Sequence, residues 1–171
     1  AGAPIVVEAC SADAGTLTAD LTPVQLSGAS VTISATQADA PIVPAGYEKV
    51  YVLTSGSTLI IEQIGTAPTF TVTAAGTYTI HTLVAELSDM NDPNFLDASV
   101  IVPGTTTGVD VLGIVTGSGL CAALDVAGAP IVVQSSLSIA NNIFIAVSYA
   151  HLTLPTIPII SISVDADILQ Q

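Results

Sequence analysis

The sequence Ala-Gly-Ala-Pro-Ile-Val-Val occurs twice in this chain, as Ala1–Val7 and again as Ala127–Val133. A cysteine lies close to each copy: Cys10 follows the first copy and Cys121 precedes the second. An identical heptapeptide indicates a tandem repeat whose period is the offset between the copies. The two copies are then equivalent strands, and one module has a single position for such a strand. If the second copy completes this module, the first copy is free to complete another.

The balance of charge excludes several classes of partner. Only 9% of the 171 residues are charged, against about 25% in typical soluble domains. Lys49 is the single basic residue, and the net charge is −13. Nothing is therefore present to neutralise phosphates, which excludes nucleic acid as a partner and disfavours anionic membrane surfaces.

Two features predict a location outside the cell. The chain begins with Ala rather than Met, from which we expect that a leader has been removed. Two cysteines favour an oxidising compartment. Residues 126–164 contain no Asp, Glu, Lys or Arg, but prolines, serines and threonines interrupt them before a run of ~18 apolar residues is reached. We predict a protein that is secreted, extracellular or on the cell surface, without membrane insertion.

Alternation of apolar and polar residues predicts strands with one buried face. Ala29–Thr36 alternates most cleanly. Tyr47–Thr54 and Thr58–Ile64 form the strongest hairpin, joined by a short loop in which Gly56 is expected at positive φ. Further strands are expected at residues 69–73, 77–84, 98–102, 109–115 and 127–133. Helix is expected to be minor, because no segment keeps a 3.6-residue period.

Tyr78 lies in a G-x-Y-x-I pattern from Gly76 to Ile80. In immunoglobulin-like sandwiches a tyrosine near the start of a late strand bonds back to the preceding chain, forming a tyrosine corner. The alternative is an ordinary strand aromatic. We predict an all-β fold, an immunoglobulin-like β-sandwich with an extra N-terminal strand and a C-terminal β-rich tail.

Several phrases also resemble a repeat module of large secreted and cell-surface proteins of Bacteroidota. They are Cys10–Leu17, Val43–Ser55, Phe70–Leu83, Thr106–Val109 and Cys121–Pro130. The resemblance implies adhesin-like chains of β-sandwich modules with no catalytic role. In that family the AGAP segment ends one module and the Cys phrase begins the next. This implies that Ala1–Val7 is the closing strand of another module.

Three segments follow from these observations. Residues 1–9 form an N-terminal strand that could act as a donor, and residues 10–133 form the β-sandwich module. Residues 134–171 form a β-rich apolar tail that could lie between subunits. The tail departs from the family pattern, and Ser148–Thr156 resembles translated adapter sequence, so we derive no function from it.

Cys10 and Cys121 are the whole cysteine inventory. A redox pair or a metal site would be expected with CxxC spacing or a local His cluster, and neither occurs. The preferred interpretation is one structural disulfide joining the first and last strands of a module. The alternative is a bridge between subunits.

The loop Ser88–Asp97 concentrates oxygen ligands. Calcium takes about six to eight oxygens, and the candidate ligands here are Asp89, Asn91, Asp92 and Asp97. The spacing is not that of an EF-hand. The preferred interpretation is a solvated acidic loop without a cofactor, and calcium is the alternative.

No arrangement of residues indicates catalysis. His81 and His151 are far apart in the sequence, and His81 is expected on the surface of a sheet because it lies in mid-strand. No GxSxG elbow occurs. We therefore predict no catalytic residues and no enzyme.

The first heptad carries the functional prediction, through the assembly strand Ala3, Ile5, Val6 and Val7. A free apolar strand associates with an open sheet by main-chain hydrogen bonds. Because donor and acceptor surfaces differ, the contact is heterologous and builds an open fibre unless it closes into a ring. We predict a pilus-like structural subunit of an extracellular filament or surface appendage, a homopolymer self-assembling by β-strand exchange.

Two alternatives stay open. The N-terminal strand could pack within its own domain. The chain could instead be an adhesive or carbohydrate-binding repeat domain of a cell-surface protein, with surface glycans as partners.

Overall fold

The computed structural model describes residues 10–117 and 119–136. The predicted N-terminal strand, residues 1–9, lies outside the described residues, and so does the predicted tail from residue 137 onward. The account below therefore concerns the module between the two heptads and the second heptad itself.

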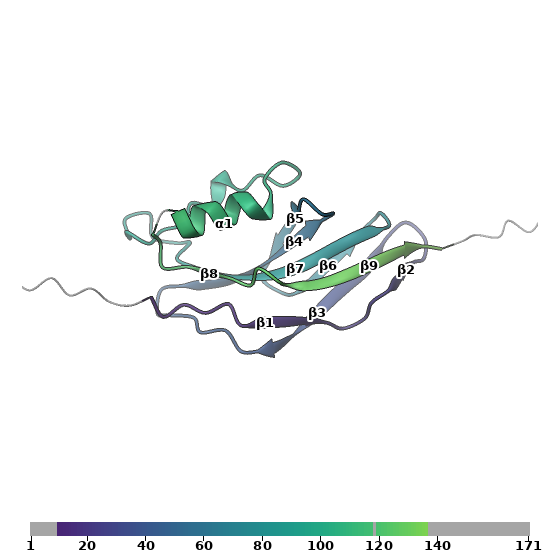
Figure 1. Ribbon diagram of the computed structural model, residues 1–171, viewed down its shortest axis with the longest axis horizontal. Coiled ribbons are helices and arrows are strands. Elements are labelled where there is room, and N and C mark those ends of the chain that lie inside the picture. Colours follow the sequence, from purple (N-terminus) through teal and green to yellow (C-terminus); the bar gives the residue numbers. More distant parts are fainter. Residues whose placement is uncertain (1–9, 118, 137–171) are drawn as a thin grey trace, which may run out of the picture. The chain divides into compact units, whose positions relative to one another are not determined.

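The described part of the chain is built mainly of β-strands. They are β1 (Thr16–Ala19), β2 (Val24–Leu26), β3 (Val31–Asp39), β4 (Glu48–Ser55), β5 (Ile60–Gly65), β6 (Thr69–Val72), β7 (Gly76–Ala85), β8 (Ala123–Leu124) and β9 (Ala129–Ser135). One sheet has the order β1-β3-β6, and the larger sheet has the order β2-β9-β7-β4-β5, with β8 paired to β7. The prediction of an all-β sandwich is confirmed (Figure 1).

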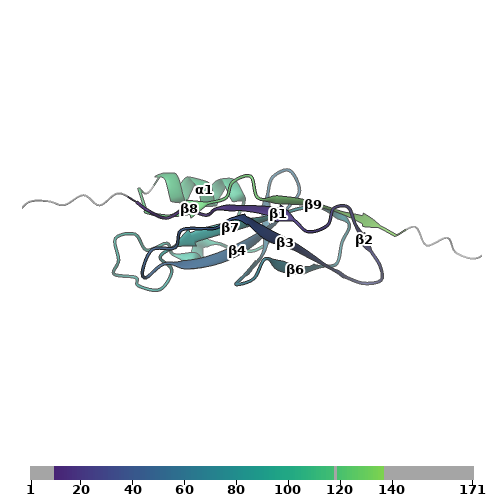
Figure 2. The same cartoon turned by 90° about the horizontal axis from the view of Figure 1, so that it is seen from below.

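The two sheets enclose the inner core. Alternate residues of the strands point into it, as the period-two pattern predicts. The most buried members include Leu17, Ile33, Leu53, Phe70, Ile80 and Ile131. Although β1 and β2 follow one another in the chain, they belong to different sheets, because β1 pairs with β3 and β2 pairs with β9 (Figure 2).

The hairpin and the predicted tyrosine bond are both present. β4 pairs antiparallel with β5, and Gly56 in the connecting loop has φ 66°. The Tyr78 hydroxyl donates a hydrogen bond to the Ala74 carbonyl oxygen at 3.0 Å. This is the backward bond expected of a tyrosine corner. The finer, immunoglobulin-like assignment stays a prediction.

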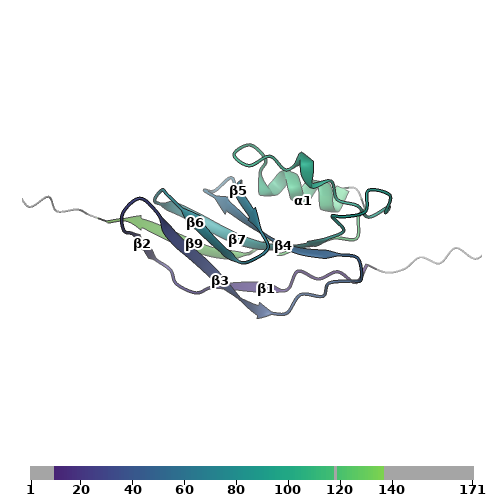
Figure 3. The same ribbon diagram turned by 180° about the vertical axis from the view of Figure 1, so that it is seen from behind.

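A second core lies on the other face of the larger sheet. The connection from β7 to β8 contains a short 3₁₀ helix, η1 (Ala98–Val100), and α1 (Gly108–Gly117). Figures 1 and 3 show α1 above β4, β5 and β7, on the side away from β1 and β3. The core here includes Val52, Ile61, Leu83, Leu96, Val111 and Val115. The larger sheet is therefore buried on both faces under α1.

The strands predicted at residues 98–102 and 109–115 are wrong, because these residues carry η1 and α1. The β-branched residues of the second segment favour a strand only weakly, and a local cap decides the helix. The Thr107 backbone N–H and hydroxyl donate to the Asp110 carboxylate at 2.9 and 2.7 Å, and the Asp110 N–H lies 3.3 Å from the Thr107 hydroxyl. This reciprocal arrangement is a capping box. The T-x-x-D spacing was the signal that the sequence prediction missed.

Gly128 begins the turn into β9 in a conformation that a side chain would not tolerate. Its φ is 58°, in the left-handed region that costs other residues about 1–2 kcal/mol. A Cβ atom there would lie 2.6 Å from Thr79 Cγ2, 2.7 Å from His81 Nδ1 and 2.7 Å from the Ile80 carbonyl oxygen. The second position of the heptad therefore requires glycine, because a larger residue would be strained and would overlap its neighbours.

We expect Gly128→Ala to lower the free energy of unfolding by about 2–5 kcal/mol, because it adds steric overlap to backbone strain. The matched control is Gly56→Ala, since Gly56 has a similar φ with nothing within 4 Å of the added Cβ; it should cost only about 1–2 kcal/mol. Urea denaturation of both variants measures the difference. Equal losses would contradict the close approach at Gly128.

Candidate functional site: the slot of strand β9

The second heptad forms most of β9, an interior strand of the larger sheet. On one side β9 pairs antiparallel with β7, from Ala129 opposite Ile80 to Val133 opposite Gly76. On the other side it pairs in parallel with β2, where Val133 lies opposite Val24. We call the position between β2 and β7 the β9 slot. β7 pairs with Ala129–Val133 and β2 with Val133–Ser135, so the two neighbours overlap at Val133.

The side chains of β9 divide cleanly between its two faces. Ala129, Ile131 and Val133 are 1%, 0% and 2% exposed and belong to the inner core. Pro130 and Val132 point to the other face, and Val132 is 42% exposed. At about 25 cal/mol per Å² of apolar surface, the three inward residues supply most of the energy of the strand, and the outward face supplies little.

Asp125 anchors the start of β9. Its carboxylate accepts hydrogen bonds from Gly128 N–H at 3.0 Å and from Leu17 N–H at 3.3 Å, so it ties β9 to β1 across the sandwich. Its own N–H donates to the Thr82 carbonyl oxygen at 2.9 Å. The side chain is buried. The sequence analysis did not single out Asp125, although a lone carboxylate three residues before an apolar strand is a signal for such an anchor.

The prediction that His81 lies on the surface of a sheet is wrong. His81 is 5% exposed, because α1 and the β7–β8 connection cover the outer face of β7. Its Nδ1 lies 2.9 Å from the Asp125 carbonyl oxygen, and its Nε2 lies 3.1 Å from the Thr54 hydroxyl. Since a carbonyl only accepts, Nδ1 carries the proton and Nε2 accepts. His81 also borders an apolar cavity of about 70 Å³.

Burial lowers the pKa of His81 below its ordinary value of 6.5, although the backbone and charge of Asp125 act in the opposite direction. The unfolded chain therefore binds more protons than the native protein once the pH falls below 6.5. The stability that the neutral ring confers is complete above pH 6.5 and is lost as the pH drops through that value toward the folded pKa.

We expect the free energy of unfolding to fall between pH 7.5 and 5.5 by up to about 1.4 kcal/mol per pH unit from this group. His81→Asn is expected to be less stable at neutral pH and to lack this part of the slope. Denaturant titrations at several pH values compare the two proteins. Parallel pH profiles would contradict the assignment of the slope to His81.

The two cysteines form a disulfide within the chain, with their Cα atoms 5.1 Å apart. The prediction of a structural disulfide within the module is confirmed, although the bond does not join the first and last strands as predicted. The cysteines lie just outside the strands, Cys10 before β1 and Cys121 before β8. Their sequence separation is 111, and closing a loop of that length is worth about 4–5 kcal/mol in the chain-entropy model.

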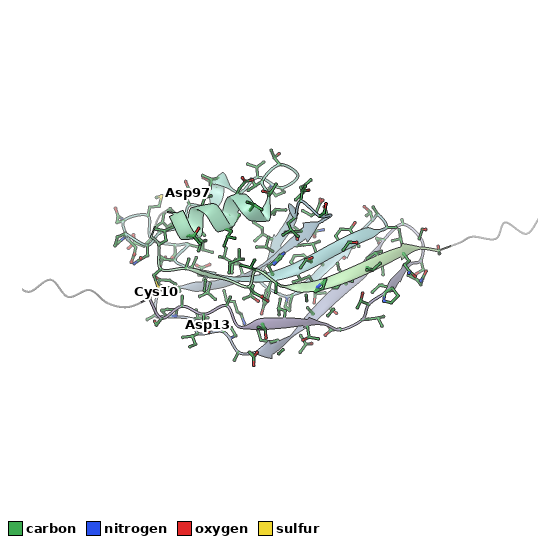
Figure 4. The ribbon with its side chains drawn as sticks, in the orientation of Figure 1. Cys10, Asp13 and Asp97 are labelled. Atoms are coloured by element: carbon green, nitrogen blue, oxygen red, sulfur yellow. A yellow bond between two sulfur atoms is a disulfide. The ribbon has the colours of Figure 1, made fainter. Side chains whose placement is uncertain are left out.

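The position of the disulfide matters more than its energy. Figure 4 places Cys10 at the end of the sandwich opposite the C-terminal end of β9. The chain therefore enters the module at one end and leaves β9 at the other. The bond holds residue 10 at its end, whatever the residues before it do.

The candidate calcium ligands make local hydrogen bonds. The carboxylates of Asp89, Asp92 and Asp97 each accept a backbone N–H two residues ahead, from Asn91, Asn94 and Ser99, at 2.9, 2.7 and 2.9 Å. These bonds shape local turns, and Asp97 caps η1. Among residues 10–117 and 119–136, no three His, Cys, Asp or Glu side chains gather as a metal site would require. The calcium alternative stays an untested prediction.

One carboxylate of this loop region is held more firmly. Glu86 accepts hydrogen bonds from the Ser88 hydroxyl at 2.6 Å, from Ser88 N–H at 2.8 Å and from Asp89 N–H at 2.9 Å. These bonds, that of the Ser88 hydroxyl most, lower the pKa of Glu86. Glu86 therefore fixes the start of the loop instead of offering a free ligand.

The assembly residues Ala3, Ile5, Val6 and Val7 lie outside the described residues. Their equivalents in β9 are described, and they are Ala129, Ile131, Val132 and Val133. Three of these four equivalents point inward, and Val132 does not. The structure thus describes the β9 slot, into which such a strand fits, and does not describe Ala1–Val7.

No family model matches the chain, and neither does any curated protein or solved structure. In the part of the chain that the structure describes, none of the helices is long and apolar enough to span a membrane. The function must therefore be argued from the slot itself.

Proposed function

We propose that this chain is a structural subunit of an extracellular filament or surface appendage, in which copies are joined by exchange of a β9-type strand. The observation that carries the proposal is the position of the second heptad. Its sequence fills an interior slot with three fully buried side chains, and the same sequence occurs once more in the chain. The sequence thus carries two copies of the strand that fits this slot, and the described residues form one such slot.

The energetics of exchange between identical strands decide how such an assembly behaves. An incoming Ala1–Val7 would replace the contacts of Ala127–Val133 one for one, so the strand itself contributes no net free energy. The resident strand has the advantage of being tethered to its own module. Exchange therefore depends on the concentration of the protein, and it is favoured where copies are crowded together.

Other features fit a secreted structural protein. The disulfide requires an oxidising compartment in which to form and persist. A chain with 9% charged residues and abundant Ser and Thr has many neutral polar side chains, which suit contacts between copies. The net charge of −13 opposes close packing at low ionic strength, and salt screens this repulsion. The resemblance to surface repeat modules of Bacteroidota agrees with this location.

We expect the full-length protein to form linear assemblies above a threshold concentration, and we expect deletion of residues 1–9 to abolish them. The deletion removes the spare strand and leaves the disulfide and the β9 slot intact, so the module should keep its stability. Electron microscopy and analytical ultracentrifugation over a range of concentrations provide the measurement. A protein that stays monomeric at the highest attainable concentration would refute the proposal.

A second candidate function is recognition of surface glycans, and a polar cleft beside the disulfide favours it. The cleft has a volume of about 620 Å³ and is lined by Ser11, Tyr47, Asp92, Asn94 and Cys121, among others. Partial burial and the nearby charges of Asp92 and Glu86 raise the pKa of the Tyr47 phenol. An aromatic ring beside amide and carboxylate groups could contact the apolar face and the hydroxyls of a sugar.

If the cleft binds a neutral oligosaccharide, Tyr47→Ala should weaken binding by at least about tenfold, the effect of ~1.4 kcal/mol. Tyr47→Phe keeps the ring and removes the hydroxyl, so it separates stacking from hydrogen bonding. A glycan array followed by calorimetric titration measures both variants. Absence of binding to any neutral glycan would eliminate this candidate.

A further inference from the structure

Covalent reach limits where the first heptad can bind. To fill the β9 slot of its own module in the direction of β9, Val7 would have to lie where Val133 lies, opposite Gly76 of β7. Residue 10, however, is held by its disulfide to Cys121, with the Cα atoms 5.1 Å apart. Cys121 is two residues before Ala123, which lies opposite Val84 at the other end of β7.

The distance from Cys10 to the position of Val133 exceeds the length of the chain that connects Val7 to Cys10. Gly76 and Val84 are eight residues apart on β7, a span of about 26 Å at ~3.3 Å per residue. Two residues of extended chain account for at most about 7 Å of this, and the disulfide accounts for a further 5.1 Å. At least about 14 Å then remains between Cys10 and the position of Val133, whereas the three residues from Val7 to Cys10 span at most about 11 Å.

We propose that the disulfide directs the first heptad to the β9 slot of a second copy of this chain, by preventing it from reaching the slot of its own module. The inference rests on the proposed function and adds three specific features to it. The acceptor is an interior slot, the direction is that of β9, and the contact forms only between copies.

The register follows from the equivalence of the two heptads. Ala3, Ile5 and Val7 take the places of Ala129, Ile131 and Val133, which are buried in the inner core. Val6 takes the place of Val132 on the partly exposed face. Of the four residues predicted for the assembly strand, three would therefore point into the acceptor, and Val6 would not.

Gly2 fits the same register. Its equivalent, Gly128, has positive φ and lies against Thr79, His81 and the backbone of Ile80. A strand that only added to a sheet edge would have no need of this glycine. The first heptad thus repeats the conformational requirement of the slot as well as its hydrophobic pattern.

The edges of the two sheets offer poorer sites than the slot. β2 is three residues long and β8 two. At β5, Ile61 N–H donates to the Thr106 carbonyl oxygen, and the Ile61 carbonyl oxygen accepts from Gly104 N–H, so the connection before α1 already covers part of that edge. β1 and β6 each offer four residues. In the β9 slot, five residues of the heptad, Ala129–Val133, pair with β7, which is more than β1, β2, β6 or β8 offers.

Competition between the two copies gives a direct test. Ile131→Val weakens the resident strand and leaves the donor intact, so it should raise the equilibrium constant for exchange by roughly two- to tenfold. Ile5→Val weakens the donor and should lower that constant by a similar factor. The double variant Ile5→Val/Ile131→Val should return to the wild-type value, because the two strands are identical again. Analytical ultracentrifugation of the full chain measures all three constants.

Matched controls separate this competition from general effects on stability. Val6→Thr and Val132→Thr change the outward face, where Val132 is 42% exposed, and should leave the constant within twofold of wild type. These substitutions are mild enough for the module to fold, which thermal unfolding confirms for each. Opposite shifts for Ile5→Val and Ile131→Val support the proposal; shifts of the same sign, or none, overturn it.

A longer connection tests the role of the disulfide. Insertion of about fifteen Gly and Ser residues between Val7 and Glu8 gives a coil that spans on the order of 20 Å, enough for the heptad to reach its own slot. In the Ile131→Val protein this insertion should convert the assembled species to monomers of restored stability. Assemblies that persist unchanged would show that reach does not confine exchange to separate copies.

The two proposals fail in different ways. If linear assemblies form and do not respond to Ile5→Val or Ile131→Val, the filament proposal is supported and exchange into the β9 slot is overturned. Discrete exchanged dimers that respond to both substitutions, without any fibres in the electron microscope, would support the slot and overturn the filament.

Discussion

The burial of β7 on both faces is the constraint on which the rest of the structure depends. Its inward residues, Tyr78 and Ile80, pack in the inner core, and Leu83 and Ala85 pack in the core under α1. β7 also pairs with β4, β8 and β9. Because β7 is buried on both faces, its pairing with neighbouring strands is fixed in one register. This register determines which residues of a strand in the β9 slot point into the inner core. The same enclosure buries His81 and places its ring against Asp125.

The disulfide and the duplicated strand act together. The duplication alone supplies two strands for one slot, and it leaves open which slot each strand fills. The disulfide restricts the first heptad, because it holds Cys10 at the end of the sandwich opposite the C-terminal end of β9. In the proposed assembly, this restriction directs the first heptad to the slot of a second copy. A contact of this kind is heterologous, which is the geometry of an open fibre.

Prediction from the sequence succeeded where one face of a strand meets solvent and the other meets the inner core. β3 and β9 follow the period-two pattern, and Tyr78 makes the backward bond that its position indicated. The β4–β5 hairpin also forms as predicted, although β4 is buried on both faces. Prediction failed in the β7–β8 connection. There the β-branched residues of α1 were read as a strand, while the Thr107–Asp110 cap and the packing of Val111 and Val115 decided for helix. The misplacement of His81 follows from that failure, since α1 is what covers it.

The sequence by itself determined the duplication of the heptapeptide, the presence of two cysteines and the all-β character, because composition, identity and short-range periodicity are local properties. It could not determine that α1 covers the second face of the larger sheet. It could also not determine that Asp125, at the start of β9, binds Leu17 of β1, which is 108 residues away along the chain. Nor could it show that Cys10 and the end of β9 lie at opposite ends of the module. These are relations between segments far apart in the chain, and only packing in three dimensions sets them.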